Sequence, residues 1–524
     1  MKTARIVVDR DYVISRVDPR LYGAFVEHLG RVVYGGLYQP GHPCADAEGF
    51  RQDVLKLVRQ IGVPICRYPG GNFVSGFDWE DSVGPDRRPS LNLAWDSIEP
   101  NTFGLHEFCS WAEKAGSEVL YAVNLGTRTP RDARNLVEYA NFPSGSRYSD
   151  QRIRNGRREP LNIRTWCLGN EMDGVWQMGQ KTGREYGEAA REAAKLMRRV
   201  DRNIELVACG SSSSWMDTVG QWELDVLDVC YDEVDYISLH RYYENKFGNT
   251  ASYLADVLDM EQYIRTIQSA CDVIKGKKRS TKTMNLSFDE WNVGYHARAK
   301  DAQLHRDHPW THALPIMQDE YNFEDALFVG SMLITLLRHS DRIRIACIAQ
   351  LVNGIAPIMT SDTGCWAQTI FYPYLHASRF GRGEALSLRI DCPRYDTPDY
   401  TGVPEIDAVA ICTEEGEINI FCINRSLTED TVLTLNLRSF GPLRPLEHIL
   451  LHHDDVFAVN TEAAPDTVAP VSRPLPAPEG GQLSVSVPAL SWNVLRLSRE
   501  ETSRSVFPLD PLDGVGFVKK GVFP

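Results

Sequence analysis

Eight short apolar segments, separated by amphipathic stretches, are the feature that most constrains the fold of this chain. Most of them are apolar at nearly every position, as expected of parallel strands that are covered on both faces. The stretches between them include helical patterns at residues 50–61, 183–200, 260–274 and 322–337. The eight apolar segments are residues 22–26, 63–67, 118–124, 163–168, 205–209, 235–239, 284–288 and 345–349.

This alternation predicts the fold class. Strands that alternate with helices form a parallel sheet in an α/β fold, and eight such repeats close into a (β/α)8 TIM barrel. An open, doubly wound sheet is the alternative, but no Gly-x-Gly-x-x-Gly sequence follows the first segment. We therefore predict a barrel over residues 19–384.

The pattern changes after residue 383. Short strand candidates follow one another, separated by turns and by a proline-rich stretch at 463–481 that predicts a surface loop. Such a region is typical of an antiparallel β-sandwich, which we place at 385–500. Residues 1–18 have strand character and are expected to join it, and 501–524 are expected to form a C-terminal tail. The candidates are residues 385–389, 408–413, 417–425, 431–437, 483–487 and 492–497.

The charge balance restricts the partners. The 524 residues include 56 basic and 70 acidic ones, a net charge of −14, which argues against nucleic acid and anionic membranes as partners. The sequence has no run of about 18 apolar residues and no apolar signal-peptide core near its start. Twelve scattered cysteines without a Cys-x-x-Cys motif indicate reduced thiols in a cytoplasmic protein, rather than a disulfide framework or a zinc ribbon.

Polar and aromatic residues follow most of the predicted strands. The active site of a (β/α)8 barrel lies where the strands end, so these residues are expected to meet at one rim. This convergence is more informative than any single motif. The segments concerned are residues 27–31, 67–73, 169–173, 240–243, 289–292 and 350–353.

Two glutamates at this rim predict chemistry on a sugar. Glu171 and Glu290 each follow an apolar strand, and paired carboxyl groups break glycosidic bonds, one as acid and one as nucleophile. Arg67 would hold Glu290 ionised, and the charge of Glu290 would raise the pKa of Glu171. A single glutamate at a strand end is more often a surface residue. Asn170 is either a turn residue or a hydrogen-bond partner of a sugar hydroxyl.

Six motifs in order resemble the α-L-arabinofuranosidases of glycoside hydrolase family 51. The sequence WCLGNEMDG at 166–174 resembles the acid/base segment of that family, and FDEWNV at 288–293 resembles its nucleophile segment. The similarity extends from about residue 22 to 383. The other four motifs lie at residues 25–31, 67–73, 235–240 and 348–353.

The resemblance implies a retaining enzyme on a (β/α)8 barrel. Glu171 would be the acid/base and Glu290 the nucleophile that forms a covalent arabinosyl-enzyme. His240 would orient one of these two glutamates. The implied sugar-binding residues are Glu27, Arg67, Asn72, Asn170, Tyr242 and Gln350.

The implied substrates are arabinofuranosyl oligosaccharides derived from arabinoxylan or arabinan. No cofactor and no metal are needed, since two carboxyl groups supply both proton transfer and covalent catalysis. The resemblance also implies a homo-oligomer, with a hexamer as a common form in the family.

Some readings stay open. A retaining β-xylosidase, an endo-glucanase and a non-catalytic carbohydrate-binding barrel are alternatives. Trp95 and Trp176 are either platforms for a leaving-group sugar or packing residues at the rim. Gly294 and Gly354 depart from the family pattern and leave the linkage specificity open. Residues 301–318 lack a helical period, so a loop over the barrel mouth is expected rather than a metal site at its histidines.

Overall fold

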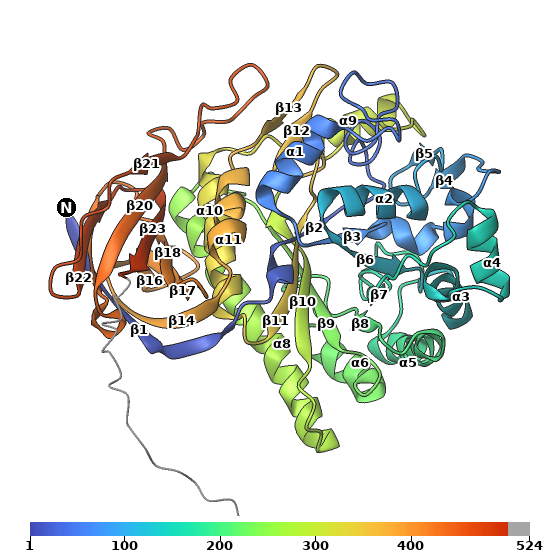
Figure 1. Cartoon of the computed structure of the whole chain (residues 1–524), viewed down its shortest axis with the longest axis horizontal. Helices are drawn as coiled ribbons and strands as arrows, with labels where there is room; N and C mark the ends of the chain where they lie inside the picture. The colour runs from blue at the N-terminus through green and yellow to red at the C-terminus, as the bar shows by residue number, and fades with distance from the viewer. Residues whose placement is uncertain (501–524) are drawn as a thin grey trace, which may run out of the picture.

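The computed structural model describes residues 1–500, in which a barrel and a β-sheet domain lie side by side (Figure 1). The tail expected at 501–524 lies outside the described residues. The boundary between the two domains, which we place between residues 384 and 385, stays a prediction. Within the described part of the chain, no helix combines the length and the hydropathy of a membrane span.

The barrel has the eight parallel strands that the apolar segments predict. Each predicted segment overlaps one strand, and they close in the order β10-β11-β2-β3-β6-β7-β8-β9. The predicted (β/α)8 fold is confirmed. The strands are β2 (Gly23–Phe25), β3 (Ile65–Tyr68), β6 (Glu118–Val123), β7 (Thr165–Leu168), β8 (Glu205–Ala208), β9 (Tyr236–Tyr243), β10 (Asn285–Val293) and β11 (Ile343–Ala349).

Helices surround the barrel, and the sequence explains where α5 begins. Thr182 begins α5 with a capping box, in which its backbone and side chain donate to Glu185. The helices are α1 (Gln52–Ile61), α2 (Leu105–Ala115), α3 (Pro130–Asn141), α4 (Arg147–Arg154), α5 (Gly183–Val200), α6 (Gln221–Cys230), α7 (Thr250–Ala255), α8 (Val257–Lys278), α9 (Arg298–Asp307), α10 (Phe323–Arg338) and α11 (Phe371–Phe380), with 3-10 turns η1 (Pro19–Tyr22), η2 (Asn72–Gly76), η3 (Trp79–Ser82) and η4 (Arg438–Phe440).

The prediction of a loop at 301–318 is wrong for residues 301–307, which belong to helix α9. None of the residues of α9 is buried. A helix that buries no apolar face needs no hydrophobic period, so its sequence lacks the signal on which the expectation depended.

The second domain is a nine-stranded sheet in the order β21-β20-β23-β18-β17-β14-β1-β19-β22. Apolar side chains from both of its halves form one core, so the sheet folds over on itself as the predicted sandwich requires. The strands are β1 (Lys2–Arg16), β14 (Glu384–Asp391), β17 (Ile406–Cys412), β18 (Glu417–Asn424), β19 (Thr431–Asn436), β20 (Leu443–His452), β21 (Val471–Arg473), β22 (Gln482–Val487) and β23 (Ser491–Arg499).

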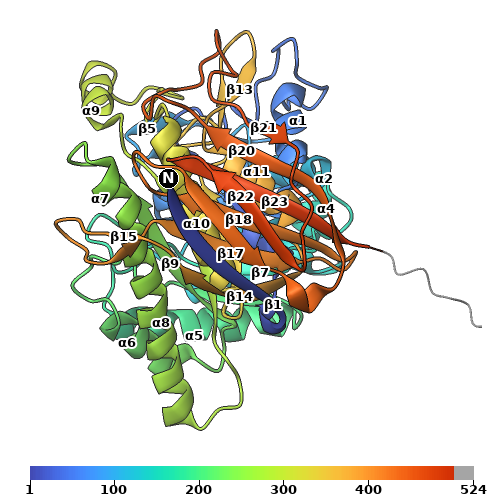
Figure 2. The same cartoon turned by 90° about the vertical axis from the view of Figure 1, so that its left-hand side faces the viewer.

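The sheet differs from the expectation in three respects. Strand β1 crosses the domain between β14 and β19 and is parallel to β19, although the other pairs are antiparallel (Figure 2). Strand β20 was not predicted, since Pro445 interrupts its pattern, and the ladder accommodates it by a shift of register. The edge strand β21 lies inside the expected loop 463–481.

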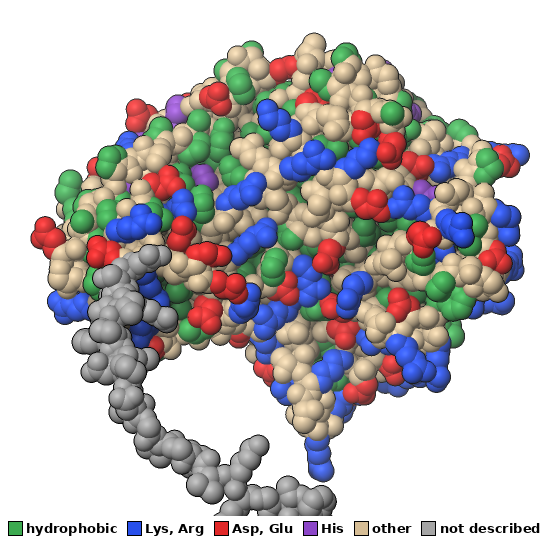
Figure 3. Space-filling view, in the orientation of Figure 1, with side chains coloured by type: hydrophobic (Ala, Val, Ile, Leu, Met, Phe, Trp, Pro, Cys, Tyr) green, Lys and Arg blue, Asp and Glu red, His purple; other side chains and the backbone are tan. Residues whose placement is uncertain are grey.

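Three short hairpins complete the fold. They are β4 (Ser90–Asn92) with β5 (Ser97–Glu99), β12 (Ile358–Thr360) with β13 (Cys365–Ala367), and β15 (Arg394–Tyr395) with β16 (Val403–Pro404). On the face drawn in Figure 3, acidic and basic side chains are interspersed, as suits a soluble surface.

Helix α10 joins the two domains. It is buried on all sides from Phe323 to Leu337, because the barrel lies against one face and the sheet against the other. Trp492 of β23 packs on Gly330, where an added Cβ would lie 2.7 Å from the indole ring. The indole Nε1 donates to Nδ1 of His376 in α11 at 3.1 Å.

We expect Trp492→Ala to destabilise the protein strongly. The side chain is fully buried at this interface, and loss of such an aromatic group costs about 3–5 kcal/mol. Urea unfolding monitored by circular dichroism measures the change. Trp310→Ala is the control, because Trp310 is 41% exposed and its loss should change the free energy of unfolding by less than about 1 kcal/mol. Equal effects of the two substitutions would contradict the proposed role of Trp492.

Candidate active site

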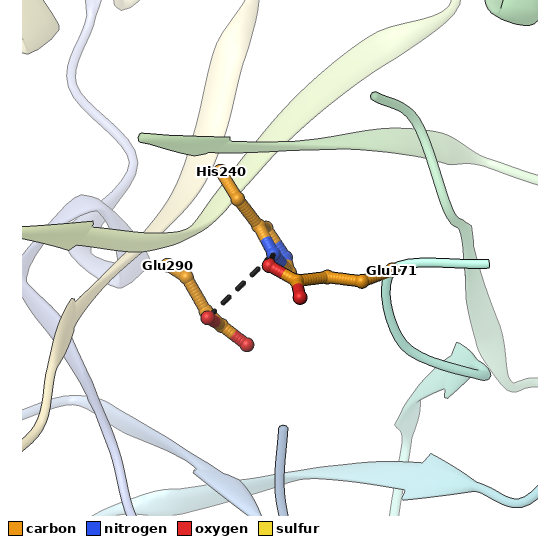
Figure 4. Close-up of side chains that lie close together, drawn as sticks. All are labelled: Glu171, His240 and Glu290. Atoms are coloured by element: carbon orange, nitrogen blue, oxygen red, sulfur yellow. Dashed lines mark hydrogen bonds and ion pairs between the residues drawn. The ribbon is translucent and has the colours of Figure 1, made fainter. Parts of the chain in front are cut away.

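Two glutamates face each other at the carboxyl ends of the barrel strands (Figure 4). Glu171 follows β7 and Glu290 lies in β10. One carboxyl oxygen of each and a ring nitrogen of His240 lie within 4.8 Å of one another. Both glutamates are buried, with 9% and 5% exposure. Two carboxyl groups this near suit a retaining glycosidase, in which the pair lies roughly 5–5.5 Å apart.

The local backbone aims both side chains. Glu171 is the third residue after the end of β7 and has a left-handed backbone conformation, with φ of 45°. In β10, two residues lie between Ser287 and Glu290, whereas only one lies between their partners Ser238 and His240 in β9. This extra residue is a β-bulge, which changes the direction in which the following side chains point.

Glu290 receives two hydrogen bonds from opposite sides. Arg67 donates to Oε1 at 2.7 Å, and the hydroxyl of Tyr242 donates to Oε2 at 2.8 Å. The guanidinium of Arg67 also donates to Oδ1 of Asn170 at 2.8 Å. Two donors on its oxygens suit a carboxylate, and they fix its orientation in the barrel mouth.

The surroundings of Glu171 favour its protonated form. Burial raises its pKa, and the negative charge of Glu290 adds to the increase. Two contacts oppose the increase: Nδ1 of His240 lies 2.9 Å from Oε1, and the indole of Trp176 donates to Oε2 at 2.7 Å. The net direction is upward, which is the direction that a general acid requires.

His240 lies among three carboxyl groups. Its Nε2 is 3.0 Å from Oδ1 of Asp289, and its Nδ1 is near both Glu171 and Glu290. Burial alone would favour the neutral ring, but the charge of Glu290 and the hydrogen bonds with Asp289 and Glu171 raise the pKa of His240 to about 10. The imidazole is therefore a cation at neutral pH.

Asp289 is a site residue that the sequence did not indicate as such. It is 1% exposed, and its Oδ2 accepts a hydrogen bond from Cys167 at 3.3 Å and lies 3.6 Å from Nε of Arg67. The charge of Arg67 and the contact with His240 outweigh burial and lower its pKa. Strand alternation places neighbours on opposite faces, but the bulge lets Asp289 and Glu290 both face the site.

Glu27 and Gln350 form a second polar pair deep in the barrel mouth. Their backbone and side-chain groups exchange hydrogen bonds of 2.8 and 3.1 Å. The carboxyl of Glu27 also accepts from the backbone of Phe73 at 2.9 Å and from the indole of Trp95 at 2.8 Å. A Cβ at Gly71 would lie 2.2 Å from this carboxyl, so only glycine allows the approach. Burial raises the pKa of Glu27 to about 7.

All nine residues inferred from the sequence lie at this one end of the barrel. Asn170 donates to Oδ1 of Asn72 at 3.4 Å, which connects the loops that follow β7 and β3. Trp95 and Trp176, whose roles the sequence left open, each donate an indole N–H to a carboxyl group of the site. The only sequence feature that pointed to these two tryptophans was their position in loops at the rim of the barrel.

The two glycines that depart from the family pattern lie in different places. Gly294 lines the cleft that opens outward from Glu171, together with Tyr295, whose ring packs 5.3 Å from that of Tyr242. Gly354 lies away from the carboxyl groups, where an added Cβ would come 2.9 Å from Val32.

A closed (β/α)8 barrel with two facing carboxyl groups at its mouth has the architecture of a glycoside hydrolase. Two family models match this chain: the α-L-arabinofuranosidase 1 domain over residues 57–262, and the α-L-arabinofuranosidase C-terminal domain over residues 289–491. The chain belongs to the α-L-arabinofuranosidases of glycoside hydrolase family 51, and the predicted family is confirmed.

Three relatives illustrate the similarity. An intracellular exo-α-(1→5)-L-arabinofuranosidase of Halalkalibacterium halodurans is 54% identical and covers 95% of this chain and 99% of its own. An exo-α-(1→6)-L-arabinofuranosidase of Bifidobacterium longum is 43% identical and covers 95% of this chain and 98% of its own. The solved structure of AbfB, a family 51 α-L-arabinofuranosidase of B. longum, matches with a TM-score of 0.90 at 42% identity, covering 95% and 99%.

We expect His240 to remain doubly protonated at pH 8. A folded-state pKa of about 10 lies above the value of about 6.5 in the unfolded chain. The corresponding stabilisation is complete below about pH 6.5 and is lost as the pH rises through about 10. NMR of histidine labelled with ¹⁵N measures the state of the ring. His376 is the control, since burial lowers its pKa to about 4 and it should be neutral in the same sample. A neutral His240 at pH 7 would contradict this assignment.

Proposed function

We propose that Glu171 and Glu290 hydrolyse terminal, non-reducing α-L-arabinofuranosyl residues by a double displacement. The enzyme is an exo-acting α-L-arabinofuranosidase, a glycoside hydrolase. The observation that carries the assignment of roles is the facing pair of carboxyl groups, of which one has an increased pKa and the other accepts two hydrogen bonds. β-Xylosidase, endo-glucanase and carbohydrate-binding activities are not favoured, because relatives that are 43% to 54% identical over at least 95% of the chain are named arabinofuranosidases.

In the first step, Glu290 attacks the anomeric carbon while Glu171 gives its proton to the leaving oxygen. The arabinosyl ester that forms has no charge on Glu290. Since that charge contributed to the increased pKa of Glu171, its loss makes Glu171 a stronger acid and leaves it ionised. Glu171 then removes a proton from the water that cleaves the ester, and the anomeric configuration is retained.

The other site residues are proposed to bind the sugar. Glu27 and Gln350 present a carboxyl and an amide group at the depth of the barrel, where ring hydroxyls would accept and donate hydrogen bonds. Asn170 is held by Arg67 next to both glutamates, a position from which it would bind the 2-hydroxyl. Asn72 and Tyr242 complete this shell at the edge of the cleft.

The names of the relatives and the family resemblance also support a substrate, a location and an assembly. Several relatives are named exo-α-(1→5)-L-arabinofuranosidases, which supports short arabinan-derived oligosaccharides as substrates. The same names contain the word intracellular, which supports a cytoplasmic location. A homo-oligomer, with a hexamer as the candidate form, is supported by the family resemblance, and sedimentation analysis of the purified chain tests it.

We expect Glu290→Ala to lose roughly 10³-fold or more of kcat/KM on 4-nitrophenyl α-L-arabinofuranoside, because no group remains to form the covalent intermediate. Azide should restore turnover and give a glycosyl azide of inverted configuration. Azide with Glu171→Ala should give the retained product instead. Glu188→Ala, on the exposed face of α5, is the control and should keep full activity. Wild-type turnover by Glu290→Ala would refute the proposal.

We expect Trp176→Phe to move the basic limb of the pH profile of kcat/KM to higher pH. The indole hydrogen bond stabilises the ionised carboxyl of Glu171, so its removal raises the pKa of the acid. Trp310→Phe is the matched control, because this tryptophan lies outside the cleft. An unchanged basic limb, or a shift toward lower pH, would show that the contact does not control Glu171.

A further inference from the structure

A cleft of about 500 Å³ opens outward from Glu171 and is lined by both domains. Glu171 and Trp176 lie at its inner end. Trp215 lies next to Trp176, with 6.0 Å between their ring centroids. The exposed outer part is lined by Phe247 of a barrel loop and by Asp399 of the sheet domain. Because the proposed acid lies at the inner end, the cleft is on the side from which the leaving group departs.

The contribution of the sheet domain comes from the loop of hairpin β15–β16, which extends beside α7 (Figure 2). The hydroxyl of Tyr395 donates to the carbonyl of Ala251 in α7 at 3.2 Å. The loop is closed by two short hydrogen bonds, from Arg394 to the carbonyl of Gly402 and from the backbone of Gly402 to Asp396, both of 2.6 Å. The two internal bonds hold the shape of the loop, and the bond from Tyr395 holds it against the barrel.

The cleft exposes aromatic rings along its length. Trp215 is 62% exposed and Phe247 is 88% exposed, although both are large apolar side chains. Exposed aromatic groups that line a cleft indicate a binding site, and the C–H faces of sugar rings pack on such groups. The carboxylate of Asp399 offers acceptors for sugar hydroxyls. A cleft of this volume encloses ligands larger than one pentose unit.

We propose that the β15–β16 loop and Phe247 bind the second leaving-group sugar of a neutral pentose oligosaccharide. The sheet domain thereby takes part in selecting substrates by length. The inference rests on the proposed function, since it takes the cleavage point to lie at Glu171. A linear chain that leaves the inner end of the cleft would place its first leaving-group unit near Trp176 and Trp215 and its second unit between Phe247 and Asp399.

The test compares three substrates: 4-nitrophenyl α-L-arabinofuranoside, α-(1→5)-arabinobiose and α-(1→5)-arabinotriose. Only the trisaccharide has a second leaving-group sugar. Phe247→Ala and Asp399→Ala should lower its kcat/KM about 5- to 20-fold, the effect of losing one packed ring face or one hydrogen bond to a charged group. For the other two substrates, kcat/KM of each variant should stay within about twofold of the wild-type value, because neither substrate reaches the outer cleft.

Two exposed residues outside the cleft serve as matched controls. Phe457→Ala removes a phenylalanine that is 57% exposed, and Asp454→Ala removes a fully exposed aspartate. Both should leave all three values unchanged. Circular dichroism and melting temperatures establish that every variant is folded.

The possible outcomes are distinct. A wild-type enzyme that turns over none of the three substrates refutes the proposed function. If the wild type is active, an unchanged trisaccharide value in Phe247→Ala and Asp399→Ala overturns the inference alone. An equal loss of kcat/KM on all three substrates also overturns the inference, because the residues would then act on folding or assembly. The same holds if the loss accompanies a change in the mass of the protein in solution.

Discussion

The buried guanidinium of Arg67 is the charge on which the site depends. It is 1% exposed, lies over the ring of Phe25 at 4.7 Å, and pairs with Glu290, Asn170 and Asp289. A charge in the interior is tolerated only when it is paired, and removal of one partner of such a pair costs about 3–5 kcal/mol. Strands β2, β3 and β10 and the end of β7 are therefore held in one arrangement by the groups that the reaction uses.

The cluster also separates the properties of its carboxyl groups. Two cations, Arg67 and His240, lie among Asp289, Glu290 and Glu171. Asp289 contacts both cations and has a lowered pKa, whereas Glu171 lies near only His240 and has a raised pKa. The position of each carboxyl group relative to the two cations, rather than its residue type, therefore determines that Asp289 is ionised and that Glu171 can donate a proton.

The sheet domain supports this arrangement from outside. Alternate residues of β17 face two different cores: Val409 and Ile411 face the barrel helices, whereas Ala408 and Ala410 face the interior of the sheet domain. Helix α10 is consequently covered on both sides, and it follows β10, which carries Glu290. A short hairpin of the same domain extends to the cleft, so one element of the fold serves packing and another faces the substrate path.

Much of this could be predicted from the sequence, because burial on both faces leaves a local signature. The eight apolar runs indicated the eight barrel strands, and residues at their ends indicated Glu171 and Glu290. The family motifs added the other seven predicted site residues, whose roles stay predictions. The strand order and the common rim then followed from general rules for barrels.

The tertiary structure alone decided features that depend on register and on contacts between distant segments. The bulge in β10 brings Asp289 into the site, and the sequence has no signal for an extra residue in a strand. The indole contact of Trp95 depends on where two loops meet, and that of Trp176 depends on how the single loop after β7 folds. Strand β20 pairs despite Pro445, and α9 forms without an apolar face. Local periodicity records which residues are buried, but only the assembled barrel determines which of them touch.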